Sequence, residues 1–459
     1  MEFVGRENEL ELLNNLIKSD NFESVLIYGR RRIGKSELIK KCLETNNITS
    51  IYYESKQTSE QNNLVSLSNV VSYCLHMPPL AFGNIEELLD FVFEKSINQK
   101  IILVIDEYPF LKAKIEGMDS ILQTLIDKYI NSSKLKLIVC GSYIQVMKDI
   151  LSTHNPLYGR FKKTIDLLPM NYYDTSKFYS GFSNEDKVSL YSVFGGIPYY
   201  NSLISENKTV KENIIDLIAS KDSSLFQEIP SFLNTEISRI VNANEVFEVL
   251  GKGYHKFTDI VDKSHVSSAP STIDVLKQLI NLRLVEKRSP INDENNKKKS
   301  AYYISDNLAL FYYKYIFPNQ SIINVMNKND FFDSFIKEDF YTMYIPKQFE
   351  NICKEYLIKE NLAGKLETSF YKIGTYYYDD AINKTNGEFD VVTLDKNGYI
   401  FYECKYKEKP INNQIIYKEI NQVISSGLYC YKYGFFSKNG FSEKTDASII
   451  QYTLDDLFK

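Results

Sequence analysis

Two groups of chemically reactive residues stand near opposite ends of this 459-residue chain. Near the start, the segment Gly29–Ser36 reads GRRRIGKS and fits the spacing G-x-x-x-x-G-K-[ST]. In such a loop the glycines let backbone N–H groups approach phosphates, the lysine reaches the β- and γ-phosphates, and the hydroxyl ligates Mg²⁺. The loop follows an apolar segment and precedes a helical pattern, which is the context it requires. The sequence therefore predicts a site for ATP and Mg²⁺. The nucleotide contacts in this segment are assigned to Gly29, Arg32, Ile33, Gly34, Lys35, Ser36 and Glu37.

A second apolar segment, Ile101–Ile105, ends in the acids Asp106 and Glu107. We expect Asp106 to hold the Mg²⁺ together with Ser36, and Glu107 to activate the attacking water. The alternative is that the two acids only cap a strand end.

Two residues farther along could complete the nucleotide site. Ser142 could orient the water or sense the γ-phosphate, although it could equally be an ordinary turn residue. Arg160 could stabilise transition-state charge in cis or across a subunit interface, and its alternative is a surface salt bridge.

Near the end of the chain, Asp390 is followed by Glu403-Cys404-Lys405. Glu403 and Lys405 are two residues apart on an expected strand, so they point to the same face. The turn chemistry of Asp395–Gly398 would fold the strand of Asp390 back alongside them. Acids placed in this way can hold a divalent cation that lowers the pKa of bound water, and the lysine can position the nucleophile. Ordinary salt bridges on a sheet surface are the alternative.

Two more residues could reach this second site from helices. Glu350 could add a third carboxylate, and Gln422 could touch the site from the helix that follows Lys405. The metal ligands expected over the whole chain are Ser36, Asp106, Glu350, Asp390 and Glu403.

The elements that position these residues form four expected domains. Residues 1–170 alternate buried strands with helices, which predicts an α/β domain with a parallel sheet covered on both faces. Residues 171–234 are helical and are expected to form a lid. Residues 235–320 contain three helical segments and a hairpin, the pattern of a winged helix-turn-helix. Residues 331–459 form a further α/β domain. The strands expected in the first domain are Ser24–Tyr28, Ile51–Tyr53, Ile101–Ile105, Leu135–Cys140 and Thr164–Leu168.

The recognition helix of the winged unit is expected at Pro270–Leu282, where Ser271, Thr272 and Lys277 could reach phosphates or base edges. The hairpin loop carries Lys297–Lys299, a potential contact with phosphate or the minor groove. A winged helix that serves only as a protein–protein spacer is the alternative.

Composition excludes several classes of protein. The six cysteines are scattered without a C-x-x-C pair, which argues against a disulfide framework or a zinc knuckle. The net charge of −5 restricts any nucleic-acid surface to a local patch. No apolar run approaches the roughly 18 residues of a membrane span, and the start lacks the layout of a signal peptide. The sequence thus predicts a cytoplasmic protein.

Several motifs occur in the order typical of one family: Phe3-Val4-Gly5-Arg6-Glu7, the loop Gly29–Ser36, Asp106-Glu107, Gly141-Ser142 and Gly195-Gly196-Ile197-Pro198. Over residues 1–235 the chain resembles the archaeal-type ATPases of the AAA+/STAND group of P-loop NTPases. The resemblance implies that Gly5 and Arg6 lie beside the nucleotide base and that Pro198 contacts the nucleotide from the lid. An obvious second sensor arginine is missing, so ring assembly does not follow.

The C-terminal acids resemble the PD-(D/E)xK restriction-endonuclease-like domain that accompanies this type of ATPase, with Phe389 in place of the usual proline. The resulting hypothesis is an ATPase that couples nucleotide state to nucleic-acid binding, with DNA as the expected partner, and to Mg²⁺-dependent cleavage. The chain could also form a homo-oligomer. One alternative is an ATPase switch whose C-terminal domain binds nucleic acid or protein without cleaving. Another is a regulator in which slow hydrolysis times a signalling state.

Overall fold

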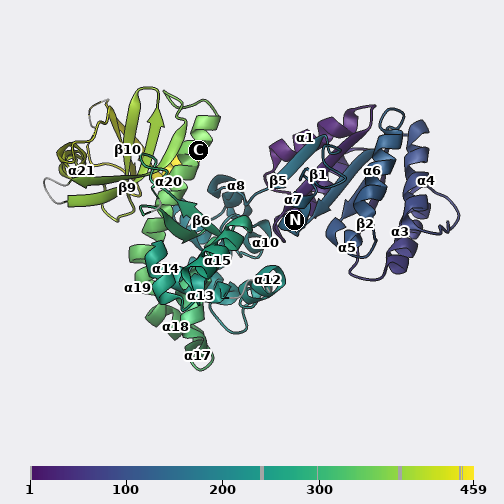
Figure 1. The fold of residues 1–459 in the computed structure, drawn as a ribbon. Helices are drawn as coiled ribbons and strands as arrows, with labels where there is room; N and C mark the ends of the chain where they lie inside the picture. Colours follow the sequence, from purple (N-terminus) through teal and green to yellow (C-terminus); the bar gives the residue numbers. More distant parts are fainter. Residues whose placement is uncertain (1–2, 238–241, 297, 381–384, 444–445, 447) are drawn as a thin grey trace. The chain divides into compact units, whose positions relative to one another are not determined.

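The computed structural model describes residues 3–237, 242–296, 298–380, 385–443, 446 and 448–459 (Figure 1). The chain forms two compact units. The first comprises Met1–Pro169 with Ile197–Tyr199, and the second comprises Met170–Gly196 with Tyr200–Lys459. Most of the segment expected as a lid therefore belongs to the second unit, whereas the short loop around Pro198 stays with the first.

A five-stranded parallel sheet forms the centre of the first unit, with the strand order β2-β3-β4-β1-β5. Both β3 and β4 are buried along their whole length, because helices cover the two faces of a parallel sheet. All five strands expected from the sequence are present. Their bounds are β1 Glu23–Gly29, β2 Thr49–Glu54, β3 Ile101–Asp106, β4 Lys136–Gly141 and β5 Lys163–Leu167.

Helices connect these strands and supply the core of the first unit. Apolar side chains of several of them, among them Leu67, Leu88 and Leu122, pack into one cluster with Leu103 and Leu137 of the sheet. The helices are α1 Glu7–Lys18, α2 Lys35–Thr45, α3 Glu60–Cys74, α4 Ile85–Asn98, α5 Tyr108–Lys112, α6 Met118–Tyr129 and α7 Ile144–Asp149.

The second unit begins with a helical region. Its elements are α8 Tyr172–Ser176, η1 Lys177–Tyr179, α9 Asn184–Phe194, α10 Pro198–Asn201, α11 Val210–Leu217 and α12 Glu228–Ile237, of which α10 starts in the first unit. Three helices and a two-stranded antiparallel sheet follow, close to the expected positions. They are α13 Ala243–Gly251, α14 Phe257–Lys263, α15 Ala269–Asn281, β6 Val285–Arg288 and β7 Ala301–Ile304.

A run of short helical segments joins the hairpin to the C-terminal domain. The sequence analysis predicted no helix in this region. The run includes two π-helical turns, η2 and η4. The segments are α16 Asn307–Phe311, η2 Tyr312–Ile316, η3 Phe317–Asn319, α17 Gln320–Ile323, α18 Lys328–Phe335, α19 Lys337–Asp339 and η4 Phe340–Tyr344.

The C-terminal domain contains a mixed five-stranded sheet with the order β12-β11-β10-β9-β8. Strand β9 is antiparallel to β8 and β10, whereas β10, β11 and β12 run parallel. A long helix precedes the sheet, and another connects β10 to β11. The bounds are α20 Ile345–Leu362, β8 Lys372–Asp380, β9 Thr385–Asp395, β10 Gly398–Lys405, α21 Asn413–Ser425, β11 Lys432–Ser437, β12 Ile449–Thr453 and α22 Leu454–Leu457.

One of the expected nucleic-acid contacts needs correction, and another has partners within the unit. Thr272 is fully buried and its hydroxyl donates to the carbonyl of Ser268 at 3.0 Å, so it cannot reach a base edge. Lys299 forms an ion pair with Asp293 at 3.5 Å and lies 4.4 Å from the ring centroid of Tyr377. Thr272 differs from the expectation because the packing of α15 buries it and its hydroxyl is satisfied within the helix, whereas a phosphate contact by Lys299 stays a prediction.

Three other expected contacts, Lys298, Ser271 and Lys277, stay predictions. Lys298 is exposed, and Lys297 lies outside the described residues. Ser271 and Lys277 sit on α15, where Lys277 is largely exposed and lies 3.8 Å from Asp274.

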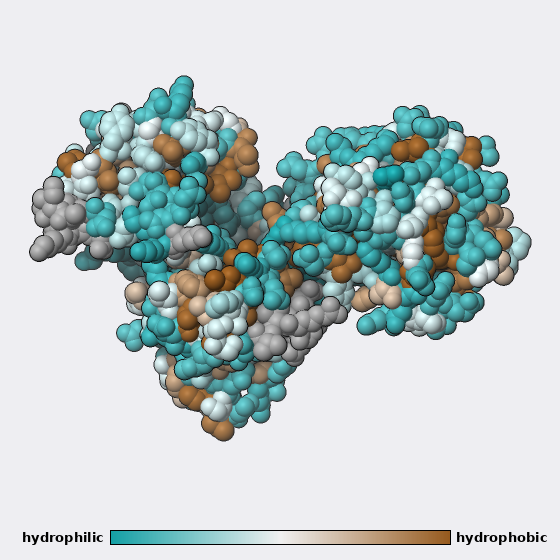
Figure 2. Space-filling model, viewed as in Figure 1, coloured by the Kyte–Doolittle hydropathy of each residue, from teal (hydrophilic) through white to brown (hydrophobic). Residues whose placement is uncertain are grey.

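The surface is mostly hydrophilic over the face shown in Figure 2, with hydrophobic residues in limited patches. All six cysteines are free thiols, as the scattered spacing predicted. Within the described ranges, no helix combines the length and the apolar character that a bilayer crossing requires.

Within the second unit, hydrogen bonds of Glu355 on α20 link the helical region to the C-terminal domain. Its carboxylate accepts hydrogen bonds from the Tyr172 backbone N–H at 2.9 Å and from the Tyr191 hydroxyl at 2.9 Å. Burial raises the pKa of Glu355 to about 7, although both hydrogen bonds oppose the rise.

The raised pKa of Glu355 predicts a pH-dependent stability. Because the folded-state pKa lies above the unfolded value, this contribution is fully present in acid and is lost as the pH rises through about 7. Between pH 5 and pH 8 we expect the free energy of unfolding to fall in the wild type by about 1–3 kcal/mol more than it falls in Glu355→Gln. Thermal unfolding at both pH values measures this, with the exposed Glu338→Gln as control. An equal loss in both variants would refute the role of Glu355.

Candidate functional site

The loop between β1 and α2 has a backbone that two glycines make possible. A Cβ on Gly29 would lie 2.5 Å from the Leu167 carbonyl oxygen, so no side chain fits there. Gly34 has a φ of 93°, in the left-handed region that glycine adopts freely. Arg32 has a φ of 67°, and Ile33 is completely buried beneath the loop. The chain therefore turns tightly from strand to helix, as a phosphate-binding loop must.

Lys35 and Ser36 begin α2 and point into the same site. The Lys35 ammonium donates to the carbonyl oxygens of Gly29 at 3.0 Å and Arg30 at 3.2 Å, so it lies over the loop. The Ser36 hydroxyl donates to Asp106 Oδ2 at 2.7 Å. Because β4 lies between β1 and β3, the carboxyl ends of these strands meet at one edge of the sheet, where open α/β sheets bind ligands. A hydroxyl and a carboxylate at this spacing are the oxygen donors that Mg²⁺ prefers.

Asp106 is buried and accepts four hydrogen bonds. Besides Ser36, the donors are the Cys140 thiol at 2.7 Å, the Glu107 backbone N–H at 2.8 Å and the Tyr52 hydroxyl. Burial alone would raise the pKa of Asp106, but these hydrogen bonds outweigh burial and hold the pKa below its usual value. The carboxylate therefore stays ionised at neutral pH. The sequence analysis did not identify Tyr52 or Cys140, although both lie near the carboxyl ends of expected strands.

Glu107 has a φ of 49°, a strained conformation for a non-glycine residue, and such strain is often found at functional sites. The Ser142 hydroxyl donates to Glu107 Oε2 at 2.8 Å, and the Ser142 backbone N–H lies 3.2 Å from the same oxygen. Ser142 therefore orients Glu107 directly, a contact that the sequence analysis did not foresee.

The remaining predicted contacts of this site fall into two groups. Gly5 and Arg6 both have positive φ, and the Arg6 guanidinium donates to the carbonyl oxygens of Leu168 at 2.7 Å and Ile33 at 3.3 Å. A Cβ on Gly34 would lie 3.7 Å from Pro198 Cγ. The structure thus brings Arg6 and Pro198 to the phosphate loop, and Gly5 directly precedes Arg6 in the chain. In addition, Arg32 lies 4.2 Å from the ring centroid of Tyr199.

Two predicted residues face elsewhere. Arg160 forms a bidentate pair with Asp127, at 3.2 and 3.0 Å, which is the salt-bridge alternative. Glu37 is on the first turn of α2 and pairs with the exposed Lys40 at 3.1 Å. Nucleotide contacts by Arg160 and Glu37 remain predictions.

The second group of predicted residues meets in a cavity of about 230 Å³ in the C-terminal domain. The antiparallel pairing of β9 with β10 ends with Val391 opposite Tyr402, so Asp390 and Glu403 follow side by side. Helices α20 and α21 contribute further acids. The predicted residues that line the cavity are Glu350, Asp390, Glu403 and Gln422, and the sequence analysis missed Glu388 and Glu419.

Two lysines bridge these acids in pairs. Lys405 contacts Glu403 Oε1 at 2.6 Å and Glu419 Oε1 at 3.0 Å. Lys347 contacts Asp390 Oδ1 at 2.7 Å and Glu350 Oε2 at 2.8 Å. The sequence analysis also missed Lys347. Both Lys347 and Glu419 had a signal in the sequence. Lys347 lies three residues before Glu350 on α20, and Glu419 lies three residues before Gln422 on α21, so each pair shares one face of its helix.

Two acids of this cavity, Glu350 and Glu403, have a raised pKa. Burial raises the pKa of Glu350 to about 7, and the nearby charge of Asp390 raises it further, against the opposing effect of Lys347. Burial also raises the pKa of Glu403, and Lys405 counteracts this rise. Oxygen donors in such a cavity suit a hard divalent cation. In the described part of the chain, however, no three acid, cysteine or histidine side chains converge as a ready metal-binding group. A cation held by Glu350 and Asp390 would have to displace the ammonium group of Lys347.

Comparisons with known proteins extend these observations. Residues 3–203 match a family described as an ATPase domain predominantly from Archaea. Residues 312–420 match a family of archaeal and bacterial proteins of unknown function. An uncharacterised protein of Methanocaldococcus jannaschii is 31% identical over 464 residues, which cover 99% of each chain. An uncharacterised ATP-binding protein of the same organism is 46% identical over 46 residues, 10% of this chain and 78% of its own.

Among solved structures, a Walker-type ATPase of Pyrococcus abyssi is similar in fold. Its TM-score is 0.52 at 15% identity, and the match covers 68% of this chain and 96% of that protein. At this identity the likeness concerns the fold alone. It agrees with the parallel sheet of the first unit.

The position of Lys35 predicts its importance for nucleotide binding. We expect Lys35→Ala to weaken ATP binding about 100-fold or more, because charge-assisted hydrogen bonds to phosphate would be lost. Calorimetric titration with ATP measures the change. Lys40→Ala, which removes an exposed lysine of the same helix, should leave the affinity unaltered. Unchanged ATP affinity in Lys35→Ala would refute the phosphate-loop assignment.

Proposed function

This chain belongs to the family of ATPases found predominantly in Archaea, and we propose that nucleotide binding and hydrolysis control nucleic-acid binding and Mg²⁺-dependent DNA cleavage by its C-terminal domain. The first half of this proposal concerns residues of the phosphate loop and of the strand end at Asp106. The second half concerns the acidic cavity lined by Asp390 and Glu403. Each half has its own test.

In the proposed hydrolysis, the loop amides and Lys35 bind the phosphates of ATP. A bound Mg²⁺, held by Ser36 and Asp106, would neutralise phosphate charge. Glu107 accepts a proton from the attacking water, and Ser142 keeps its carboxylate oriented through the hydrogen bond at 2.8 Å. The low pKa of Asp106 suits a residue that must remain anionic.

In the proposed cleavage, Asp390, Glu403 and Glu350 hold a divalent cation, which would lower the pKa of bound water and stabilise the leaving oxygen. Lys405 stands beside Glu403 and positions the nucleophile. The observation that carries this proposal is the meeting of acids from β9, β10 and α20 in one cavity, with Lys405 bonded to Glu403 at 2.6 Å. The order of helix, three strands, helix and strand, from α20 to β11, also supports a restriction-endonuclease-like domain.

Nucleic-acid binding is proposed for the unit formed by α13, α14, α15 and the β6–β7 hairpin, as a winged helix-turn-helix. Lys277 on α15 and Lys298 in the hairpin loop are exposed and could contact phosphates. The hairpin loop is attached to the C-terminal sheet, because the Ile291 N–H donates to the Thr375 carbonyl at 2.8 Å. DNA bound at the hairpin would therefore lie close to the domain proposed to cut it.

A second candidate function is an ATPase switch whose C-terminal domain binds nucleic acid or protein without cleaving it. The specific observation in its favour is that Lys347 and Lys405 already neutralise the acids in pairs. In this case the ion pairs are structural, and no cation takes the place of Lys347.

Hydrolysis can be separated from nucleotide binding at Glu107. We expect Glu107→Gln to lower the ATPase rate about 100-fold or more while ATP affinity stays close to that of the wild type, because the general base is lost and the phosphate contacts are kept. A phosphate-release assay and a binding titration measure the two quantities. The exposed Glu116→Gln serves as control. An unchanged rate of ATP hydrolysis in Glu107→Gln would show that another residue is the general base.

Cleavage can be tested at the acidic cavity. The full chain is incubated with Mg²⁺ or Mn²⁺ and with plasmid, linear or single-stranded DNA, with and without ATP. We expect Asp390→Ala and Lys405→Ala each to reduce cleavage by about 100-fold, whereas Lys407→Ala, an exposed lysine two residues away, should have no effect.

The outcomes of this assay distinguish the two candidate functions. Cleavage lost in both variants supports the nuclease. Cleavage that survives both would reject the assigned site. Absence of cleavage on every substrate, together with intact ATP hydrolysis, would favour the switch.

A further inference from the structure

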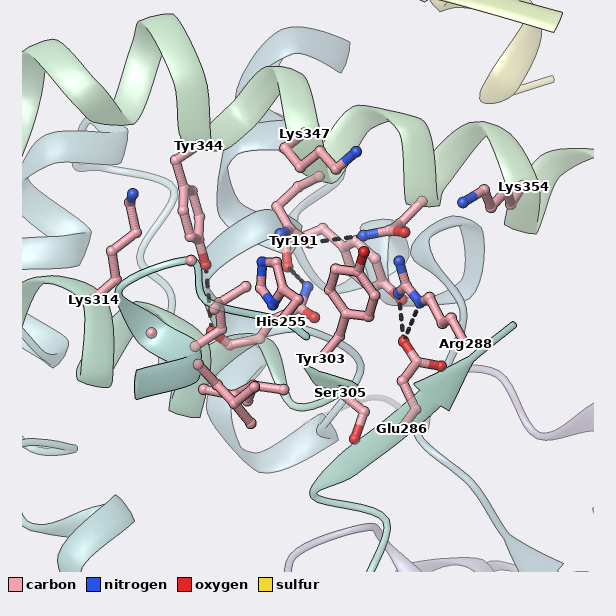
Figure 3. Close-up of a pocket in the computed structure, with 18 of the residues that line it drawn as sticks. Tyr191, His255, Glu286, Arg288, Tyr303, Ser305, Lys314, Tyr344, Lys347 and Lys354 are labelled. Atoms are coloured by element: carbon pink, nitrogen blue, oxygen red, sulfur yellow. Dashed lines mark hydrogen bonds and ion pairs between the residues drawn. The ribbon is translucent and has the colours of Figure 1, made fainter. Parts of the chain in front are cut away.

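The second unit contains a cavity of about 540 Å³, larger than the acidic cavity, and its lining includes Lys347, which pairs with Asp390 of the acidic cavity. Helix α20, the β6–β7 hairpin, α16 and η2 supply most of its lining. Figure 3 shows Lys347 and Lys354 on one helix with their side chains directed toward one another, and Glu286 and Arg288 on strand β6. The volume falls in the range of about 300–1,000 Å³ that small-molecule sites occupy.

Cationic residues outnumber acidic ones in this lining. The four cationic residues are Arg288, Lys314, Lys347 and Lys354, and the two acidic residues are Glu286 and Glu355. Both acids are already engaged. Glu286 pairs with Arg288, with the Arg288 Nε at 2.8 Å, and Glu355 accepts the hydrogen bonds from Tyr172 and Tyr191.

Lys354 differs from the other three cations. Lys314 pairs with Asp339 at 3.0 Å, and Lys347 pairs with Asp390 and Glu350. Lys354, in contrast, has no hydrogen bond or ion pair within 4.0 Å among the residues that the structure describes. A partly buried ammonium group without a close anionic partner is costly. Lys354 is therefore the cation of this lining without an ion pair within 4.0 Å among the described residues, although Asp390 and Glu350 lie close enough to raise its pKa.

The electrostatic environment of the cavity is positive. Burial lowers the pKa of Lys354, and the adjacent charge of Arg288 lowers it further. Burial likewise lowers the pKa of His255, with further lowering by Arg288 and Lys347 and an opposing effect from the Tyr302 carbonyl. Burial is the main cause in both groups, and at Lys354 the charges of Asp390 and Glu350 oppose the lowering. A bound anion would offset the added effect of Arg288 on both groups.

We propose that this cavity binds a small phosphate-bearing ligand, whose phosphate is held by Lys354 and Arg288. Lysine and arginine are the usual phosphate ligands, and hydrogen bonds between ionised partners are the strong ones. Apolar side chains at the rim, including Met343 and Ile358, give the cavity room for the body of a phosphate ester. The site is distinct from the phosphate loop and from the acidic cavity.

The test uses the full chain carrying Lys35→Ala, so that the phosphate loop does not dominate binding. Calorimetric titrations use three probes: inorganic phosphate, adenosine 5′-monophosphate and a 5′-phosphorylated dinucleotide. Adenosine without phosphate is the negative control. We expect saturable binding of at least one phosphate probe, and about tenfold or greater weakening when Lys354→Gln is added.

Two further variants make the outcome decisive. Lys354→Arg keeps the charge and should retain binding, whereas Lys337→Gln, an exposed lysine of α19 outside the cavity, should not alter it. Tighter binding of a nucleotide than of inorganic phosphate would identify a phosphate ester as the ligand, and equal binding would identify the phosphate group alone. Absence of saturable binding at millimolar concentrations, or equal affinity in Lys354→Gln, would overturn the proposal. Neither ATP hydrolysis nor DNA cleavage enters the readout.

Discussion

A carboxylate removed from water must be surrounded by donors or cations, and this constraint governs both candidate sites. At the end of β3, neutral donors meet the requirement: a hydroxyl, a thiol, a phenol and a backbone amide converge on Asp106 and keep it ionised. In the C-terminal cavity, ammonium groups meet it: Lys347 and Lys405 each bridge two acids. Neutral donors leave the negative charge of Asp106 available to a cation, whereas the lysines offset that of the C-terminal acids.

Sheet topology determines which donors are within reach. The order β2-β3-β4-β1-β5 places β4 between the strand of the phosphate loop and the strand of Asp106. Side chains from β2 and β4 therefore flank Asp106 on both sides, and Ser142 follows β4 to reach Glu107. In the C-terminal domain, the β9–β10 hairpin sets Asp390 beside Glu403, and α21 adds Glu419.

Helix α20 connects three features of the second unit. Glu350 lines the acidic cavity, Lys354 lines the larger cavity, and Glu355 bonds to the helical region. Lys347 belongs to two of these environments, because it lines the larger cavity while its ammonium group contacts Asp390 and Glu350. A shift of this helix, or of Lys347 alone, would alter the charge balance of both cavities together.

The sequence by itself determined much of the architecture. The loop Gly29–Ser36, the strands around it and the hairpin that carries Asp390 and Glu403 follow from local spacing and hydrophobic pattern, and the structure contains all of them. The short helices between residues 307 and 344 were not foreseen, since their π-helical turns break the regular helical period.

Tertiary structure alone decided the partners of the reactive side chains. The packing of α15 buries Thr272, and Arg160, in the turn before β5, pairs with Asp127 of α6. Tyr52 and Cys140 reach Asp106 only because β2 and β4 are its neighbours in the sheet. Local sequence specifies which element a residue joins. Which distant residue it contacts depends on the strand order and on how the helices pack. Its neighbours in the sequence determine neither of these.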